Sequence, residues 1–213
     1  MQELLTPKTD WEVKKLGELI DILSDYTANG SFESLKNNVK YYSSQNFAAL
    51  IRTTDLDKKT FAPERFTDET GYKFLSKTSL FGGELILANV GSIGKVFRVP
   101  KFNMPMTLAP NTYMIKLFKN ISQDYIYHWM KSEEFVNKLM SKVGSSTLMA
   151  INKDNLREID LLIPSELSEQ TRIATILSDM DAELEALEAQ LAKAQQIKQG
   201  MMQELLTGRV RLV

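Results

Sequence analysis

The sequence contains no cysteine and only one histidine, His128, among its 213 residues. The lack of cysteine excludes disulfide bonds, thiolate nucleophiles, zinc fingers and thiolate-held iron–sulfur clusters. A histidine metal cage or a Ser–His–Asp triad would depend on that one histidine. His128 stands beside Trp129, with no spaced His or carboxylate to complete a ligand set. We interpret it as a structural histidine, and we expect neither a metal site nor a catalytic residue.

Long apolar segments are missing as well. No window approaches 18 uncharged apolar residues, and residues 1–6 lack the basic and apolar pattern of a signal peptide. Apolar residues nevertheless make up 43% of the chain and charged residues 25%, a mixture typical of folded domains with a core. The sequence therefore predicts a cytoplasmic protein that makes no contact with a membrane.

A net charge is almost absent, but the charges are unevenly distributed. The overall value is −1, which taken alone disfavours a nucleic-acid binder. Residues 1–160 hold 21 Lys and Arg against 19 Asp and Glu, a net of +2, whereas residues 161–213 hold 5 against 8, a net of −3. The two regions are therefore expected to bind different partners.

Catalytic motifs are not found either. Gly91–Lys95 resembles a phosphate-binding loop, but its spacing is wrong and Val96 stands where a Mg²⁺-binding Ser or Thr belongs. Asp10, Glu12 and Lys14 could be read as a nuclease-like set, yet no second supporting acid can be assigned. We predict a protein that is not itself an enzyme.

An internal repeat is present at the two ends of the sequence. Residues 1–6 and residues 202–207 both read MQELLT, an offset of 201 (202 − 1). Pro7 follows the first copy and Gly208 the second, and both residue types end helices. This predicts that residues 1–7 are the end of a spacer-type helix and that the chain is one unit of a longer tandem repeat. A helical tail motif reused by chance is the alternative.

From about Ile173 onward, apolar residues recur at alternating spacings of 4 and 3, and the register then slips after Ala194. Such a heptad stripe is typical of a coiled-coil seam. The predicted dimerisation seam consists of Ile173, Leu177, Met180, Leu184, Leu187, Leu191, Ala194, Ile197, Met201 and Leu205. At 1.5 Å per residue, a helix over 168–206 would be about 58 Å long. The alternative is a helix that folds back on its own domain.

Residues 8–164 show strand-like runs separated by turns. We expect strands at 47–51, 84–88, 95–99 and 112–117, a helix at 123–140 and a last strand at 156–163. The predicted fold class is α+β. A mostly-β domain over 8–164 would precede a long helix over 165–207, with 208–213 as a tail, and the helix would form an antiparallel coiled coil.

Several motifs, in order, resemble the specificity subunit of type I restriction–modification systems. The segment Trp11–Gly17 is similar to the entry of its target recognition domain, and Ile51–Leu56 matches an IR-x-x-DL pattern. Gly83–Gly94 is similar to its glycine-flanked hairpin, and Asn111 to a recurrent polar position after it. Glu169-Gln170 and Ile173 after Pro164 match the start of a spacer helix, although Ser165–Ser168 departs from the family's usual residues.

This resemblance implies a non-catalytic reader of double-stranded DNA with one target recognition domain, a half-length form of the subunit. Methyltransferase subunits would dock on it and carry S-adenosylmethionine, so this chain would hold no cofactor, and restriction or translocase subunits can join them. We expect a second copy to pair through the seam as a homodimer, which would make the DNA site an interrupted palindrome. At about 3.4 Å per base pair, the 58 Å helix limits the separation of the half-sites to roughly 17 base pairs.

DNA contacts require basic side chains for phosphates and donors or acceptors for bases. The candidates are Tyr41, Tyr42, Arg52, Lys73, Lys77, Ser92, Lys95, Asn111, Ser145, Ser146, Asn152 and Lys153. The alternative function is a coiled-coil adaptor or scaffold without a DNA-reading role.

Overall fold

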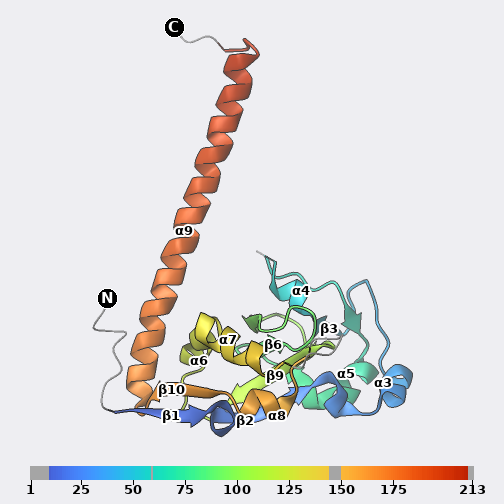
Figure 1. Cartoon of the computed structure of the whole chain (residues 1–213). Helices are drawn as coiled ribbons and strands as arrows, with labels where there is room; N and C mark the ends of the chain where they lie inside the picture. The colour runs from blue at the N-terminus through green and yellow to red at the C-terminus, as the bar shows by residue number, and fades with distance from the viewer. Residues whose placement is uncertain (1–9, 59, 144–149, 211–213) are drawn as a thin grey trace. The chain divides into compact units, whose positions relative to one another are not determined.

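The computed structural model describes residues 10–58, 60–143 and 150–210 (Figure 1). The chain divides into two compact units, residues 1–171 and 172–213. The first unit contains three β-sheets and the helices between their strands, and most of the second is a single long helix. No helix in the described part of the chain has the length and apolar character needed to span a membrane.

Two four-stranded sheets form the body of the first unit. One sheet has the order β2-β9-β6-β7 and is antiparallel throughout; the other has the order β4-β3-β8-β5, with β3 and β8 parallel. Their strands are β2 (Ile20–Asp25), β3 (Ala48–Ile51), β4 (Phe66–Thr67), β5 (Ser79–Leu80), β6 (Leu85–Ala88), β7 (Val96–Arg98), β8 (Met106–Leu108) and β9 (Thr112–Leu117).

The four internal strands expected from the sequence are confirmed to within one residue at each end, as β3, β6, β7 and β9. Residues 85–88 are buried on both faces, which explains why this stretch is a continuous apolar run rather than an alternating one. A mostly-β domain followed by a long C-terminal helix is therefore the observed architecture, and the predicted fold class is confirmed.

The main core joins the two sheets. One buried cluster contains Ala49 and Ile51 of β3 together with Ile86 of β6 and Met114 of β9. Side chains from both sheets therefore share one apolar layer, as expected when each sheet has an inward face to bury. A second cluster, which includes Tyr26, Leu35 and Leu75, lies under the helices between β2 and β5.

Short helices connect the strands. They are α2 (Leu16–Leu19), α3 (Phe32–Asn38), α4 (Thr53–Leu56), α5 (Glu69–Phe74), α6 (Gln123–Met130), α7 (Glu133–Ser141) and α8 (Lys153–Arg157), with 3₁₀ turns at η1 (Tyr26–Asn29) and η2 (Ser76–Thr78). The single helix expected at 123–140 is interrupted between α6 and α7. The Ser132 hydroxyl accepts a hydrogen bond from the backbone N–H of Phe135 and starts α7 as a new helix.

The expected last strand at 156–163 is wrong in its first half. Residues 153–157 form α8, because the Asn152 side chain accepts a hydrogen bond from the backbone N–H of Asn155 at 2.7 Å and caps a helical turn. The strand β10 (Asp160–Pro164) begins only after this turn and pairs with β1 (Trp11–Lys15). An isolated apolar residue, Leu156, is buried from a helix as easily as from a strand, which explains the error.

Five strand ends meet at one end of the paired sheets. The last residues of β2 and β6, Asp25 and Ala88, pair with the first residues of β9. Ile51 at the end of β3 pairs with Leu108 at the end of β8. The turn Ala109–Asn111 between β8 and β9 therefore lies among the segments that leave β2, β3 and β6. We call this end of the sheets the loop end.

The helix α9 (Leu167–Leu206) has 40 residues. It begins directly after Glu166. The C-terminal end is confirmed: Gly208 has φ of 71°, and the backbone N–H groups of Arg209 and Val210 both donate to the carbonyl of Glu204. The first copy of the repeat, at residues 1–6, lies outside the described residues.

The predicted seam residues lie mostly on exposed positions of α9. From Met180 to Met201, all seam side chains are exposed, with Leu184, Leu187 and Leu191 each more than half accessible. Ile173, Leu177 and Leu205 are partly buried. The central seam is therefore an exposed apolar stripe along α9.

Candidate nucleic-acid interface

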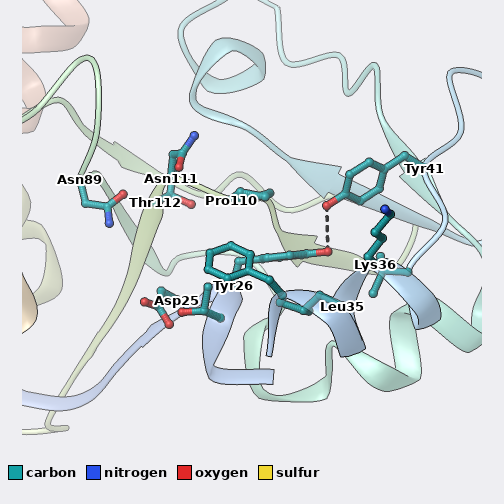
Figure 2. Close-up of a pocket in the computed structure, with 12 residues that line it drawn as sticks. Asp25, Tyr26, Leu35, Lys36, Tyr41, Asn89, Pro110, Asn111 and Thr112 are labelled. Atoms are coloured by element: carbon teal, nitrogen blue, oxygen red, sulfur yellow. Dashed lines mark hydrogen bonds between the residues drawn. The ribbon is translucent and has the colours of Figure 1, made fainter. Parts of the chain in front are cut away.

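Two depressions adjoin at the loop end of the first unit. One has a volume of about 430 Å³ and is lined by residues of η1, α3 and the segments around β9; the other, of about 280 Å³, lies toward β3. Tyr41, Pro110 and Asn111 line both and form the ridge between them. Figure 2 shows the first depression, with Tyr26 and Tyr41 on one side and Asn89 and Asn111 on the other. We call these the large and the small depression.

A pair of hydrogen-bonded tyrosine hydroxyls lies on one wall of the large depression. Tyr41 donates a hydrogen bond to the hydroxyl of Tyr26 at 2.8 Å (Figure 2). Burial raises the pKa of Tyr26, and the hydrogen bond to Tyr41 raises it further. Both effects favour the neutral phenol, so this wall offers hydroxyl groups rather than charge. The ring of Tyr41 is about half exposed and so remains available to a ligand.

Asn111 has an unusual backbone conformation. Its φ of 67° makes it the only residue other than glycine with positive φ in the part of the chain that the structure describes. Asparagine tolerates this left-handed conformation better than most residues, and such conformations concentrate at functional sites. The backbone carbonyl of Asn111 accepts a hydrogen bond from the N–H of Asn89, while its side chain is exposed. The turn therefore presents an amide at the ridge between the depressions.

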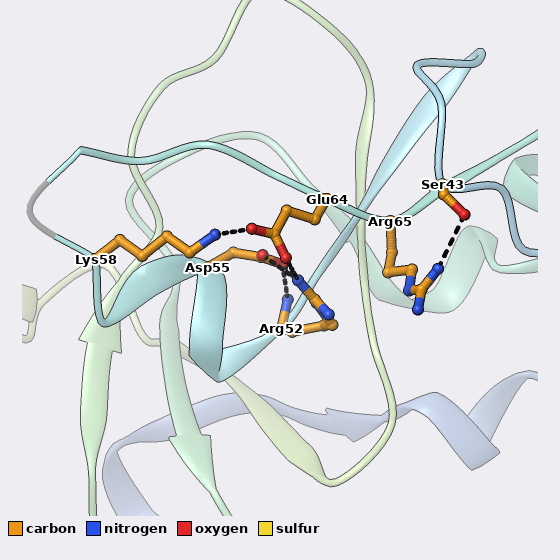
Figure 3. Close-up of polar contacts among 6 residues, drawn as sticks. All are labelled: Ser43, Arg52, Asp55, Lys58, Glu64 and Arg65. Atoms are coloured by element: carbon orange, nitrogen blue, oxygen red, sulfur yellow. Dashed lines mark hydrogen bonds and ion pairs between the residues drawn. The ribbon is translucent and has the colours of Figure 1, made fainter.

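Arg52 lines the small depression, but its guanidinium is bound to two carboxylates (Figure 3). Its Nη2 lies 2.6 Å from Oδ1 of Asp55 and 3.0 Å from Oε2 of Glu64, and its Nε donates to Oδ2 of Asp55 at 3.0 Å. Lys58 forms a further ion pair with Glu64. The pKa of Arg52 is raised, first by the hydrogen bond to Asp55. Its positive charge is thus largely compensated inside the domain.

Arg65 is a residue of the small depression that sequence reasoning missed. Its guanidinium is exposed and donates one hydrogen bond, to the Ser43 hydroxyl at 3.2 Å (Figure 3). Among the described residues it forms no ion pair within 4.0 Å. No spacing or motif marks Arg65 in the sequence; its position follows only from the pairing of β4 with β3.

Two other predicted residues stand beside the large depression. Asn152 caps α8, and the Nζ of Lys153 lies 3.0 Å from Oδ1 of Asp25, which lines the depression. Nearby, the hydroxyl of Tyr113 donates to the carbonyl of Ile151. The segment that follows residue 149 is thereby tied to the loop end, although Ser145 and Ser146 themselves lie outside the described residues.

Ser92 and Lys95 belong to the hairpin loop between β6 and β7. Both are exposed, and the Nζ of Lys95 forms an ion pair of 2.8 Å with Asp57. Because both partners are more than half exposed, this pair is weak and can open when a phosphate competes for the lysine. The loop starts at Asn89 and so leaves the sheet beside Asn111.

Tyr42, Lys73 and Lys77 do not line either depression. The hydroxyl of Tyr42 donates to Asp68, Lys73 pairs with Glu69 one helical turn away, and the backbone N–H of Lys77 donates to the side chain of Asn29. The structure therefore brings Tyr41, Arg52 and Asn111 together, with Lys153, Asn152, Ser92 and Lys95 on adjacent segments.

This arrangement offers groups that can bind a ligand. The walls supply guanidinium, amide, hydroxyl and aromatic groups, and Leu50 and Ala109 form an apolar floor in the small depression. Within residues 10–58, 60–143 and 150–210, no three His, Asp or Glu side chains are grouped as a metal site would need. Such donor-rich, shallow surfaces suit recognition of a polar macromolecule.

The fold and this interface define a recognition domain carried on a long helix, and sequence comparison identifies the class. A family described as the type I restriction modification DNA specificity domain matches residues 8–199. This chain therefore belongs to that family. A putative type I restriction enzyme MjaX specificity subunit from Methanocaldococcus jannaschii is 24% identical over 216 residues, covering 93% of this chain and 46% of the relative. The chain thus spans about half the length of this curated relative.

Solved structures share the fold. The S subunit of a type I restriction–modification system from M. genitalium has a TM-score of 0.57 at 16% identity, over 94% of this chain and 46% of that one. The HsdS subunit from Thermoanaerobacter tengcongensis gives 0.60 at 15% identity, over 93% and 45%. A third, from a study of complex assembly in the type I R-M system, gives 0.65 at 14%, over 93% and 46%. The alternative of an adaptor without a DNA role is not favoured.

Proposed function

We propose that this chain is the non-catalytic, sequence-reading subunit of a type I adenine methyltransferase and restriction complex, and that it reads one half of a bipartite DNA site. The observation that carries the proposal is the loop end. There, five strand ends place donor, acceptor and aromatic side chains around two adjoining depressions in a member of the DNA specificity family.

A subunit that catalyses no reaction itself needs partners that do. Methyltransferase subunits dock on the chain and carry S-adenosylmethionine, and nuclease or translocase subunits join the same assembly. The complex works in the cytoplasm, where its DNA is. The near-neutral charge of the chain favours weak DNA binding by the isolated subunit, because phosphate attraction supplies much of the affinity of DNA-binding proteins.

The DNA contacts divide into two kinds. Tyr41, Asn111 and the hydroxyl-lined wall of the large depression face bases or sugars, whereas exposed lysines on neighbouring segments contact phosphates. The proposed phosphate contacts are Lys73, Lys77, Lys95 and Lys153, and the proposed polar contacts beside them are Tyr42, Ser92, Ser145, Ser146 and Asn152. Arg52 shapes the wall through its ion pairs, since its charge is already shared by Asp55 and Glu64.

The second half of the site would be read by a second copy. The seam of α9 exposes Met180, Leu184, Leu187, Leu191 and Met201 at a coiled-coil spacing. When a second helix covers these exposed leucines, the free energy falls by about 25 cal/mol for each Å² of apolar surface removed from water.

Charge along α9 favours an antiparallel pair. Residues 173–190 contain five acidic residues and no basic one, whereas Lys193 and Lys198 follow in the next part of the helix. In a parallel pair the two acidic stretches would face each other. In an antiparallel pair each acidic stretch faces the partner's lysines, and the resulting two-fold axis makes the DNA site an interrupted palindrome.

Methylation by the reconstituted complex tests the proposal. The chain is co-expressed with its methyltransferase subunit, and modified adenines are mapped across the host genome. We expect one interrupted palindromic motif, present only when both chains are expressed. A methyltransferase that modifies the same motif without this chain would contradict the reading role. An asymmetric motif would contradict pairing of two identical copies but leave the reading role intact.

A further inference from the structure

We infer that Arg65 and Asn111 are the specificity-determining residues of this chain, and that Arg65 reads a guanine and Asn111 an adenine in the major groove. The inference rests on the proposed DNA-reading function and assigns the bases that the loop end recognises. It follows from the small depression, where these two side chains stand on the lining beside an apolar floor.

Arg65 has the charge state and geometry that base reading needs. The two arginines of the small depression differ sharply: Arg52 is held by Asp55 and Glu64, while Arg65 has one hydrogen bond to the neutral hydroxyl of Ser43. A guanidinium already bound to two carboxylates has few donors left for a base. The hydroxyl of Ser43 orients Arg65 without neutralising it. The planar fork of such an arginine fits the O6 and N7 acceptors of guanine, the commonest specific contact in protein–DNA complexes.

The side chain of Asn111 has hydrogen-bonding groups that complement adenine. Its amide offers one acceptor and two donor hydrogens, the set that pairs with N7 and N6 of adenine. Its left-handed backbone is fixed on both sides, since Ala109 donates its N–H to the carbonyl of Ile51 and the carbonyl of Asn111 itself accepts from Asn89. A short side chain on a rigid turn gives a narrow choice of positions, which is what discrimination between base edges requires.

Few polar groups line the small depression. The floor of Leu50 and Ala109 carries no side-chain donor or acceptor of its own. Of the four polar side chains on its lining, Arg52 is held by two carboxylates and the Tyr41 hydroxyl donates to Tyr26, which leaves Arg65 and Asn111 as the donors for base edges.

Substitutions can separate reading from folding at both positions. Asn111→Gly removes the amide while glycine keeps the positive φ without strain, and Asn111→Asp replaces the donor by a carboxylate. Arg65→Ala removes the guanidinium and Arg65→Lys keeps the charge without the fork. Lys119→Ala is the matched control: this lysine is exposed and lies beyond the opposite end of β9, about 20 Å away at 3.4 Å per residue.

The test measures binding of the assembled chain–methyltransferase complex to a panel of duplexes that carries every single base-pair change in the wild-type motif. We expect Arg65→Ala to lose at least about tenfold discrimination at one G·C pair, and Asn111→Gly at one A·T pair within two steps of it. Discrimination at the other positions, and at all positions for Lys119→Ala, should stay as in the wild type. Arg65→Lys should resemble Arg65→Ala in discrimination but bind all duplexes more tightly.

Three results would overturn the inference. They are unchanged discrimination in both glycine and alanine variants, an equal fall in affinity on every duplex, or relaxation at a base pair of the other kind. A variant complex that assembles but binds no duplex belongs to the second result, because it shows a role in affinity alone. Failure of the wild-type complex to discriminate among the duplexes would instead refute the proposed DNA-reading function.

Discussion

Arg52 and Asp55 form a two-pronged ion pair in which the carboxylate is completely buried: Nη2 lies 2.6 Å from Oδ1 and Nε lies 3.0 Å from Oδ2. The backbone N–H of Arg52 also donates to Oδ2, so the pair fixes the turn from β3 into α4. This pair, rather than a DNA phosphate, is the direct partner of the guanidinium.

The first prediction concerns that pair. Arg52→Ala leaves the buried carboxylate of Asp55 without its cation, and the free energy of unfolding should fall by about 3 kcal/mol. Arg52→Lys keeps the charge but not the planar guanidinium. Its free energy of unfolding should lie between those of the wild type and Arg52→Ala. Both tryptophans, Trp11 and Trp129, lie in the first unit, so their fluorescence during urea unfolding reports on this domain. A loss below about 0.5 kcal/mol for Arg52→Ala would show that the pair is not structural.

The second prediction concerns pH. The pKa of Glu64 is lowered, mainly by its hydrogen bonds to Lys58 and Arg52. A carboxylate with a lowered pKa stabilises the fold above its ordinary value of 4.5, and this contribution disappears as pH falls through the folded-state pKa. Glu64→Gln should therefore have a lower Tm than the wild type at pH 7, and the difference should shrink as the pH falls below 4.5. Because Glu64 is exposed, high salt should shrink the difference at pH 7. A difference that grows as the pH falls would contradict this account.

The third prediction concerns the start of α9. Gln170 is buried: its Oε1 accepts from the N–H of Ser122 at 2.9 Å, and its Nε2 donates to the carbonyl of Pro164 at 2.8 Å. Gln170→Ala leaves both backbone groups unpaired and should cost about 2 kcal/mol of unfolding free energy. Gln196→Ala on the exposed part of the same helix is the matched control and should change stability by less than about 0.5 kcal/mol. Equal effects of the two substitutions would remove Gln170 as an anchor.

The fourth prediction concerns self-association. Lys198 follows Ile197 of the seam, while Glu183 and Glu188 adjoin Leu184 and Leu187. In an antiparallel pair, Lys198→Glu should weaken self-association roughly tenfold, equivalent to about 1.4 kcal/mol, measured by analytical ultracentrifugation. Mixing this variant with Glu183→Lys/Glu188→Lys should restore pairing between the two different chains.

Arg209→Glu is the control for that experiment, because it makes the same charge change beyond Leu205, the last residue of the seam. It should leave pairing nearly unchanged. A wild-type chain that sediments as a monomer at tens of micromolar would refute the pairing itself. Full pairing by Lys198→Glu, with no gain on mixing, would refute the antiparallel arrangement.

Much of the architecture was predictable because local sequence patterns mark the individual strands and the long helix. Apolar runs such as 85–88 and the alternation at 112–117 marked strands, and the heptad spacing together with Gly208 marked the long helix and its end. The errors arose where a side-chain cap decided the outcome. Ser132 and Asn152 each accept a backbone hydrogen bond that starts a helix, and capping of this kind competes with strand or continuous-helix patterns that look equally good.

The site was less predictable, for a different reason. Asn111 and Tyr41, both candidates from the sequence, line the two depressions, but Arg52 and Arg65 could not be told apart from the sequence. Whether an arginine faces two carboxylates or one hydroxyl depends on which strands pair. Here Arg52 directly follows β3 and meets Asp55 and Glu64, whereas Arg65 directly precedes β4 and meets Ser43.

The convergence of five strand ends on Asn111 also bears on how such a protein changes over generations. Gln170 and Ser122, which anchor the start of α9, lie past the opposite end of β9, so the loops proposed to read DNA are remote from the helix attachment. Under the proposed function, these loops can change without disturbing the anchor of the helix. A change of base preference would then need substitutions in a few turns alone.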